Sequence, residues 1–296
     1  MAYPTVSAAY GFKPVGLIGG RPYAGSTRMI SIAEGYNQNI FNGDLVDMSA
    51  GTLIKSALAY NTSNPTAGHV GVFVGTEYSL VGGPLYGKNR YQYWPASTVS
   101  QDAVGYVIDD PNAVFRVACL AQSSAGASNS LTTIGYVSQA YVGTNLQVVA
   151  NGTGSTATGD SLAGVSSSAA PSNGSGIVRT VAAANGSFRV VQLVPDTAVV
   201  LTGSGTISST TLTLSAAVTG LQAGMQLIVS NVAGTGYTTG GYPGDYNYVT
   251  NVNGTTVTIA SAITAASTVN ISFVGYPEVI VAWNAGNHAY TNSTGV

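Results

Sequence analysis

Short runs in which apolar residues alternate with Ser or Thr recur along most of the chain. Successive side chains of a β-strand point to opposite faces, so such alternation predicts strands with one buried face. No segment shows ten or more residues of helical periodicity bounded by capping residues. The sequence therefore predicts an all-β protein with almost no helix. Examples of the alternating runs are TTLTLS (210–215), TTVTIA (255–260) and TVNISFV (268–274).

Asn-Gly pairs separate some of these runs. VTNV ends just before Asn253-Gly254, and TTVTIA begins just after it. Both central residues of a type I′ turn need positive φ, which Asn and Gly tolerate, so this pattern predicts a β-hairpin. A second hairpin is expected at Asn185-Gly186, between TVAAA and SFRVVQLV.

The first 28 residues do not share this alternation. They contain three prolines, at positions 4, 14 and 22, and scattered aromatic residues. Proline cannot donate a hydrogen bond in the middle of a sheet, so residues 1–28 are expected to form an extended N-terminal arm. The aromatic residues of this arm are Tyr3, Tyr10, Phe12 and Tyr23.

Residues 198–274 contain one charged residue, Asp245, whereas the flanking regions contain the remainder. VVQLVPDT (190–197) is typical of a strand that ends at a turn, and YPEVIVAWN (276–284) of a strand that begins after one. If these two strands pair, residues 198–274 form a small inserted β-sandwich of the immunoglobulin-like kind. Residues 29–197 plus 275–296 would then form a barrel-like core domain. A tandem arrangement of two domains is the alternative.

Charged residues are scarce, with 9 Lys and Arg and 11 Asp and Glu in 296 residues. An ordinary soluble domain is about a quarter charged, so hydroxyl and amide groups must hydrate this surface. Such a surface packs against neighbours without like-charge repulsion. A net charge of -2 without a Lys/Arg cluster argues against a nucleic-acid partner. The sequence also lacks a membrane-spanning apolar run and the basic and apolar regions of a signal peptide.

Groups that bind metals or carry catalysis are scattered along the sequence. His69, His288 and Cys119 show no metal-ligand spacing. Asp109 and Asp110 precede a Pro-Asn pair, which is typical of a turn. No nucleophile elbow or phosphate-binding loop is present. We therefore expect no enzyme activity, no cofactor and no metal.

The richest mixture of aromatic and basic residues lies in GPLYGKNRYQYWPAST (83–98). Aromatic residues and Arg are enriched at protein interfaces, so this segment is a candidate subunit interface. The same rings could instead pack on the core, or form a platform that stacks on sugars. All three interpretations stay open at this point. The candidate interface residues are Tyr86, Arg90, Tyr91, Tyr93 and Trp94.

Several strings together resemble tailed-phage virion proteins of the capsid decoration, or cement, type. The resemblance covers residues 1–197 and 275–296. Residues 198–274 are similar, by pattern alone, to the Thr/Gly-rich accessory β domains of phage surfaces. The strings that carry it are YGFKPVGLIGG, AGSTR (24–28), YWPAST, DDPNAVFRV and YPEVIVAWN with NHAYTNSTG.

The resemblance implies a trimer on the outer capsid surface, assembled in the host cytoplasm, that ties neighbouring major capsid subunits together. It implies that the arm contacts the capsid, with Tyr3, Tyr10, Phe12, Tyr23 and Arg28 as the candidate contacts. Residues 198–274 would project outward, where they are a possible glycan site. The main alternative is a glycan- or receptor-binding fibre or adhesin. A shell protein is less favoured, because the common tailed-phage shell fold carries a long spine helix.

Overall fold

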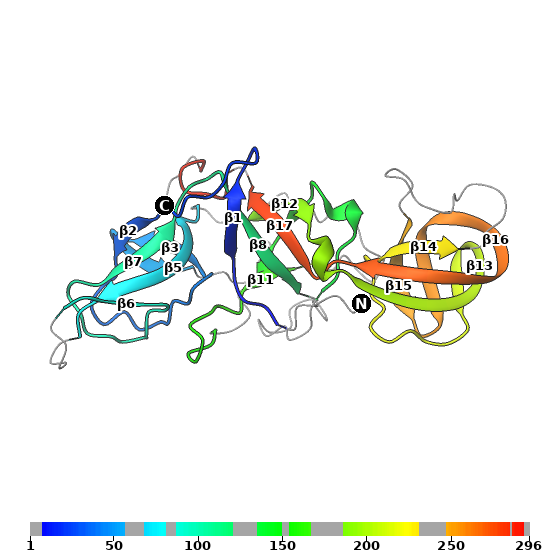
Figure 1. Cartoon of the computed structure of the whole chain (residues 1–296), viewed down its shortest axis with the longest axis horizontal. Helices are drawn as coiled ribbons and strands as arrows, with labels where there is room; N and C mark the ends of the chain where they lie inside the picture. The colour runs from blue at the N-terminus through cyan, green and yellow to red at the C-terminus, as the bar shows by residue number, and fades with distance from the viewer. Residues whose placement is uncertain are drawn as a thin grey trace.

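The computed structural model describes residues 8–56, 68–80, 87–120, 135–149, 154–166, 186–230, 247–284 and 286–292. These residues form β-strands, turns and two short 3-10 turns, η1 (Gln139–Tyr141) and η3 (Pro195–Thr197). The predicted all-β fold is confirmed. No helix in the described ranges is long and apolar enough to span a membrane. Three sheets follow one another along the long axis of the molecule (Figure 1).

The first sheet has six strands in the order β2-β7-β5-β3-β4, with β6 paired to β5. β2 and β4, at the two ends of this order, come close to each other, so the sheet is strongly curled. Its own core contains the buried side chains of Trp94, Phe73 and Leu53. The strands are β2 (Arg28–Ser31), β3 (Leu45–Ser49), β4 (Thr52–Lys55), β5 (Gly71–Tyr78), β6 (Asn89–Tyr91) and β7 (Val104–Ile108).

The second sheet has seven strands in the order β10-β11-β8-β17-β12-β9, with β1 paired to β8. Only Gln147 separates β9 from β10 in the chain, so the two ends of this order are neighbours. The sheet therefore closes almost completely into a barrel, which leaves few exposed edges. The strands are β1 (Lys13–Leu17), β8 (Ala113–Leu120), β9 (Asn145–Leu146), β10 (Val148–Val149), β11 (Gly164–Ser166), β12 (Phe188–Leu193) and β17 (Glu278–Trp283).

The arm expected at residues 1–28 differs in the structure from residue 8 onward. Residues 13–17 form β1, which pairs with β8 at one edge of the barrel, with a bulge between Pro14 and Gly16. Phe12 is fully buried in the barrel, where it stacks on Phe188 with ring centroids 4.6 Å apart. Residues 9–17 therefore belong to the barrel, whereas residues 18–27 lie between β1 and β2 and are exposed apart from the half-buried Tyr23.

The pairing predicted between residues 190–197 and 276–284 is confirmed, because β12 and β17 are antiparallel neighbours. The chain between them forms the third sheet, whose four strands pair only with one another in the order β13-β16-β14-β15. β15 also pairs with β16, so the sheet curls around one core and is not the expected two-sheet sandwich. The strands are β13 (Val199–Leu214), β14 (Gln226–Ser230), β15 (Asn247–Asn253) and β16 (Thr256–Gly275).

The expected hairpin joins β15 to β16, but its turn lies one residue later than predicted. Asn253 pairs with Thr256, so Gly254 and Thr255 are the turn residues. Only Gly254 has positive φ, at 60°, which fits a turn with Gly at its first central position and not type I′. Of the second predicted hairpin, Asn185 and residues 180–184 lie outside the described residues.

Candidate functional site: a polar groove beside β5 and β6

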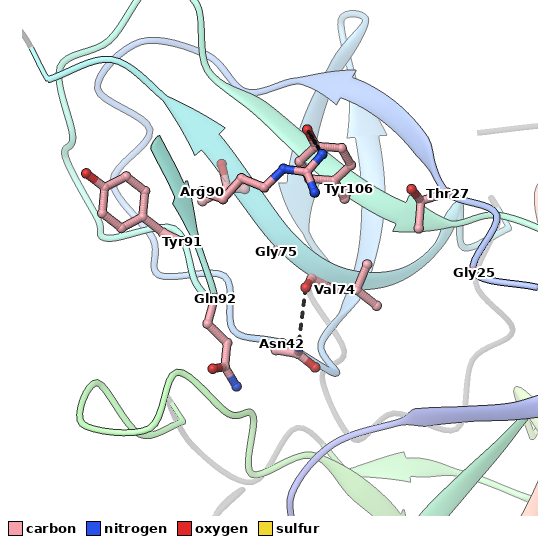
Figure 2. Close-up of a pocket in the computed structure, with 10 residues that line it drawn as sticks. Gly25, Thr27, Asn42, Val74, Gly75, Arg90, Tyr91, Gln92 and Tyr106 are labelled. Carbon is pink, nitrogen blue, oxygen red and sulfur yellow. Dashed lines mark hydrogen bonds between the residues drawn. The ribbon is translucent and has the colours of Figure 1, made fainter. Parts of the chain in front are cut away.

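An open groove of about 790 Å³ lies beside β5, β6 and β7. Gly25 and Thr27 line one side, Arg90, Tyr91 and Tyr106 line another, and Asn42 and Gln92 also border it (Figure 2). The groove thus brings the end of the expected arm next to the aromatic and basic segment at 83–98. Its volume is within the range of small-ligand sites.

Gly75 allows β6 to approach β5 closely at this groove. β5 shifts register between Phe73 and Gly75 where it pairs with β7, and Gly75 adopts φ of 150°. A Cβ atom at Gly75 would lie 3.0 Å from the carbonyl oxygen of Tyr91. A larger residue would therefore push β6 outward and change the shape of the groove.

A compact network of Arg90, Glu77 and Tyr106 forms one wall. Arg90 Nε donates to Glu77 Oε2 at 3.2 Å, and its guanidinium lies 4.7 Å from the centroid of the Tyr106 ring. The Tyr106 hydroxyl donates to the same Glu77 oxygen at 2.7 Å. Hydrogen bonds from Tyr106 and then Arg90 lower the pKa of Glu77. The two opposite charges offset each other, so this wall offers hydrogen-bonding groups with little net charge.

Amide groups lie at the opposite side of the groove. Asn42 Nδ2 donates to the carbonyl of Val74 at 3.0 Å, as Figure 2 shows. Gln92 Nε2 donates to Asp160 Oδ1 at 3.1 Å. Lys13 reaches the same point from β1, with Nζ 2.8 Å from Asn42 Oδ1 and 2.7 Å from Asp160 Oδ1. Neither the groove nor this lysine contact was identified from the sequence, because the residues are far apart in the chain.

The candidate interface residues at 83–98 divide between core and surface. Trp94 is fully buried, and its indole nitrogen donates to the carbonyl of Tyr36 at 3.3 Å. Tyr91 stacks on Tyr78 and Tyr93 stacks on Phe41, with centroids 4.5 and 5.2 Å apart. In Arg90, by contrast, 75% of the side chain is exposed. Of the original set, Tyr86 lies outside the described residues.

The candidate capsid contacts of the arm also bond within the chain. The Tyr10 hydroxyl donates to Glu278, and burial, followed by this bond, raises the pKa of Tyr10. Tyr23 packs on the barrel core, and its hydroxyl donates to the Ser26 carbonyl at 2.6 Å. Phe12 lies inside the barrel, so its ring is not available to a partner in this conformation. Tyr3 lies outside the described residues.

Arg28 retains substantial exposure, with 48% of its side chain accessible. Its Nη1 donates to the Tyr290 hydroxyl at 2.9 Å and lies 3.7 Å from Asp109 Oδ2. Tyr290 in turn donates to Asp109 at 2.6 Å. Arg28 therefore connects β2 to the C-terminal segment and still presents part of its guanidinium to the surface.

A polar cluster around the buried His69 joins the six-stranded sheet to the barrel, and the sequence did not indicate it. His69 Nδ1 lies 2.9 Å from Asp47 Oδ1, and its Nε2 lies 3.4 Å from Ser187 Oγ. This order resembles a hydrolase triad. His69 and Ser187 are only 2% and 5% exposed, however, so the described residues leave no room for a substrate. The backbone of His69 also bonds to Asn287 and Ala289, and the cluster serves as a contact between the two sheets.

Among the described residues, no three His, Cys, Asp or Glu side chains lie close enough together to hold a metal ion. Cys119 is fully buried in the barrel, and burial raises the pKa of its thiol. A thiol in such surroundings is a poor nucleophile.

No protein-family model matches the chain, and neither curated proteins nor solved structures include a significant match.

Proposed function

We propose that this chain is a structural virion protein that decorates a tailed-phage capsid and stabilises it by bridging neighbouring major capsid subunits. The proposal includes a trimer on the outer capsid surface and no catalytic activity. The proposal starts from the resemblance of several sequence strings to tailed-phage decoration proteins. The observation that carries it furthest is the way in which the few charges are satisfied within the molecule.

Most of the basic side chains already have an acidic partner in the same chain. Six of the eight Lys and Arg residues in the described ranges form ion pairs. Little net charge is therefore left to repel an identical neighbour, which favours dense arrays of copies. The six are Lys13, Arg28, Lys55, Lys88, Arg90 and Arg116.

The low charge is most pronounced in the four-stranded sheet. Residues 199–230 and 247–275 contain no Asp, Glu, Lys or Arg. The exposed positions of β13 are largely Ser and Thr, which alternate with buried Ile207, Leu212 and Leu214. A neutral hydroxyl surface stays hydrated without long-range electrostatic repulsion. Such a sheet is suited to the outward-facing part of a particle.

The N-terminal segment can be tested separately from the folded body. Residues 8–17 contribute Tyr10, Phe12 and β1 to the barrel, so deletion of residues 1–28 would damage the fold. Deletion of residues 1–7 removes none of these contacts. If the N-terminal segment holds the capsid, this shorter deletion abolishes decoration of bare shells while the chain stays folded.

Decoration is measured by co-sedimentation of the purified chain with undecorated shells, followed by electron microscopy. Arg21→Ala is a matched control, because it alters an exposed residue of the same segment downstream of the deletion. Folding of each variant is checked by circular dichroism and urea unfolding. Undiminished decoration by the folded 1–7 deletion would refute the assigned role of this segment, and an absence of decoration by the intact chain would refute the capsid function.

The groove supports a glycan-binding protein as a second candidate function. Tyr106, Gln92 and Asn42 combine an aromatic ring with amide groups and little net charge, which suits the hydroxyls of a neutral sugar. A glycan array with the intact chain and with Gln92→Ala tests this function. Selective binding that the substitution removes would support it. Equal binding by the substituted chain would exclude the groove as the site and leave the 198–274 region as the candidate. If no glycan binds selectively, the glycans on the array are excluded as ligands.

A further inference from the structure

Lys13, Asn42 and Asp160 come from three separate segments and meet beside the groove. Lys13 Nζ lies 2.8 Å from Asn42 Oδ1 and 2.7 Å from Asp160 Oδ1. Lys13 thus brings an amine into contact with both a carboxamide and a carboxylate, the three groups required to form an amide bond between two side chains. The amine is the nucleophile, the carboxamide is the electrophile, and the carboxylate moves the proton.

Backbone contacts fix the three segments against one another. Phe12 N donates to Gly43 O at 3.0 Å, Asn42 N donates to Gly159 O at 2.9 Å, and Ser161 N donates to Asn42 O at 3.0 Å. A Cβ atom at Gly43 would lie 2.8 Å from Phe12 N, so the absence of a side chain permits this close approach. These backbone hydrogen bonds, formed at or next to Lys13, Asn42 and Asp160, hold the three reacting residues in place. Such positioning lowers the entropic barrier of a bond-forming step.

We propose that Lys13 and Asn42 form an intramolecular isopeptide bond, with Asp160 as the catalytic acid and base. The bond is a covalent modification that the chain carries out on itself, without a cofactor or a second protein. This proposal goes beyond the proposed virion function and does not depend on it. Its product would link β1 covalently to the turn that precedes β3.

The reaction is balanced without any added reagent. The Lys13 ammonium first transfers a proton to the Asp160 carboxylate, which leaves a neutral amine and a carboxylic acid. The lone pair of Nζ attacks Cγ of Asn42, and the electrons of the C=O bond move to Oδ1. When the tetrahedral intermediate collapses, the Cγ–Nδ2 bond breaks. Asp160 delivers a proton to Nδ2 and accepts one from Nζ, so the products are a secondary amide and one molecule of ammonia. The proton that remains on Asp160 passes to the released ammonia or to water, which restores the carboxylate.

The orientation of the Asn42 amide suits this sequence of steps. Nδ2 donates to the carbonyl of Val74 at 3.0 Å (Figure 2). Oδ1 of the same amide accepts from Lys13 Nζ at 2.8 Å. Gln92 Nε2 donates to the same oxygen of Asp160 that contacts Lys13, and this bond fixes the carboxylate. Asn42 lines the open groove, so ammonia can leave to solvent. The Lys13 and Asp160 side chains are 33% and 32% exposed, which leaves the proton carrier in exchange with water.

The bond has a direct signature in peptide mass spectrometry of the purified chain. Proline follows both Lys13 and Arg21, and trypsin does not cut before proline, so Lys13 remains in the peptide that ends at Arg28. Asn42 lies in the adjacent peptide 29–55, and the comparison requires complete cleavage at Arg28. The expected result is a single branched species that contains both peptides, lighter than their sum by one ammonia. Fragmentation must place the link at Lys13 and Asn42. This requirement distinguishes the bond from succinimide formation at Asn42-Gly43, which also releases ammonia but joins no peptides.

Two variants and one control complete the test. Lys13→Arg keeps the positive charge beside Asp160 but removes the nucleophilic amine, and Asp160→Asn removes the proton carrier while it keeps Lys13 and Asn42. Both should yield only separate peptides, with circular dichroism showing a retained fold. Lys55→Arg alters another Lys–Asp pair, at 2.9 Å from Asp44, and should keep the branched species. Recovery of only separate peptides from the unsubstituted chain would overturn the proposal, and so would a branched species in either Lys13→Arg or Asp160→Asn.

Discussion

Substitution of Phe12 by Ala separates two possible roles of the N-terminal segment, as a partner contact or as part of the barrel core. Phe12 is fully buried, stacks on Phe188 at 4.6 Å and meets Phe115 edge-on at 6.3 Å. Truncation of a buried Phe to Ala lowers the free energy of unfolding by about 3–5 kcal/mol. The two aromatic contacts of Phe12 add to the stability that is lost, so the full range applies here. We expect Phe12→Ala to lower the free energy of unfolding by about 4 kcal/mol.

The assay is urea unfolding of the isolated chain, followed by intrinsic fluorescence. Trp283 stacks on Phe188 at 4.4 Å and therefore reports on the barrel interior. Val15→Ala is the matched control, since Val15 lies on β1 but is 46% exposed. The control should change stability by no more than about 0.5 kcal/mol. If Phe12→Ala is as stable as Val15→Ala, Phe12 does not belong to the barrel core, and its interpretation as a partner contact regains support.

Three further predictions concern separate parts of the fold. Glu278→Gln leaves the Arg116 guanidinium without its carboxylate partner. Because the Arg116 side chain is 39% exposed and stays partly hydrated, we expect a loss of about 1–2 kcal/mol in urea unfolding, and an unchanged midpoint would contradict the structural role of the pair. Burial lowers the pKa of His288, so the unfolded chain binds a proton more readily, and stability should decrease as pH falls below about 6.5. His288→Gln should have a smaller pH dependence of its urea midpoint between neutral and mildly acidic pH, and an equal dependence in both chains would exclude His288 as a source. Gly254→Ala should cost about 1 kcal/mol because its φ is 60°, whereas Asn253→Ala should be nearly neutral; equal losses in thermal unfolding would restore the predicted type I′ turn.

Local patterns were sufficient to predict the strand content and one long-range pairing. The alternation around Leu212, Val257 and Ile271 correctly indicated strands with one buried face. The pairing of β12 with β17 followed from two runs that each bordered a turn at the same interruption. In both cases the deciding information lay in the sequence of the segment itself.

The N-terminal segment was misjudged because the proline rule applies only to the interior of a sheet. Pro14 lies in β1, an edge strand that has a bulge directly after it, and both settings tolerate proline. Burial of Phe12 depends on the barrel that Phe188 and Trp283 complete from distant parts of the chain. No local pattern distinguishes such a buried ring from an exposed one.

The polar sites were also set by long-range contacts. Lys13 and Asp160 are 147 residues apart, and His69 and Ser187 are 118 apart. Barrel closure likewise depends on β9 and β10, strands of two residues each that are too short to show alternation. Sequence reasoning could name these residues as polar but could not bring them together, because their proximity arises only when the sheets pack.

The central claim is that this chain decorates the outside of a capsid. An electron cryo-microscopy reconstruction of capsid shells mixed with the chain, or of particles purified with it, tests the claim most directly. The account predicts density that fits the three successive sheets on the outer shell, in threefold clusters at contacts between major capsid subunits, with the N-terminal segment against the shell and the four-stranded sheet pointing outward. Density for the chain on the tail, or inside the shell, would contradict it.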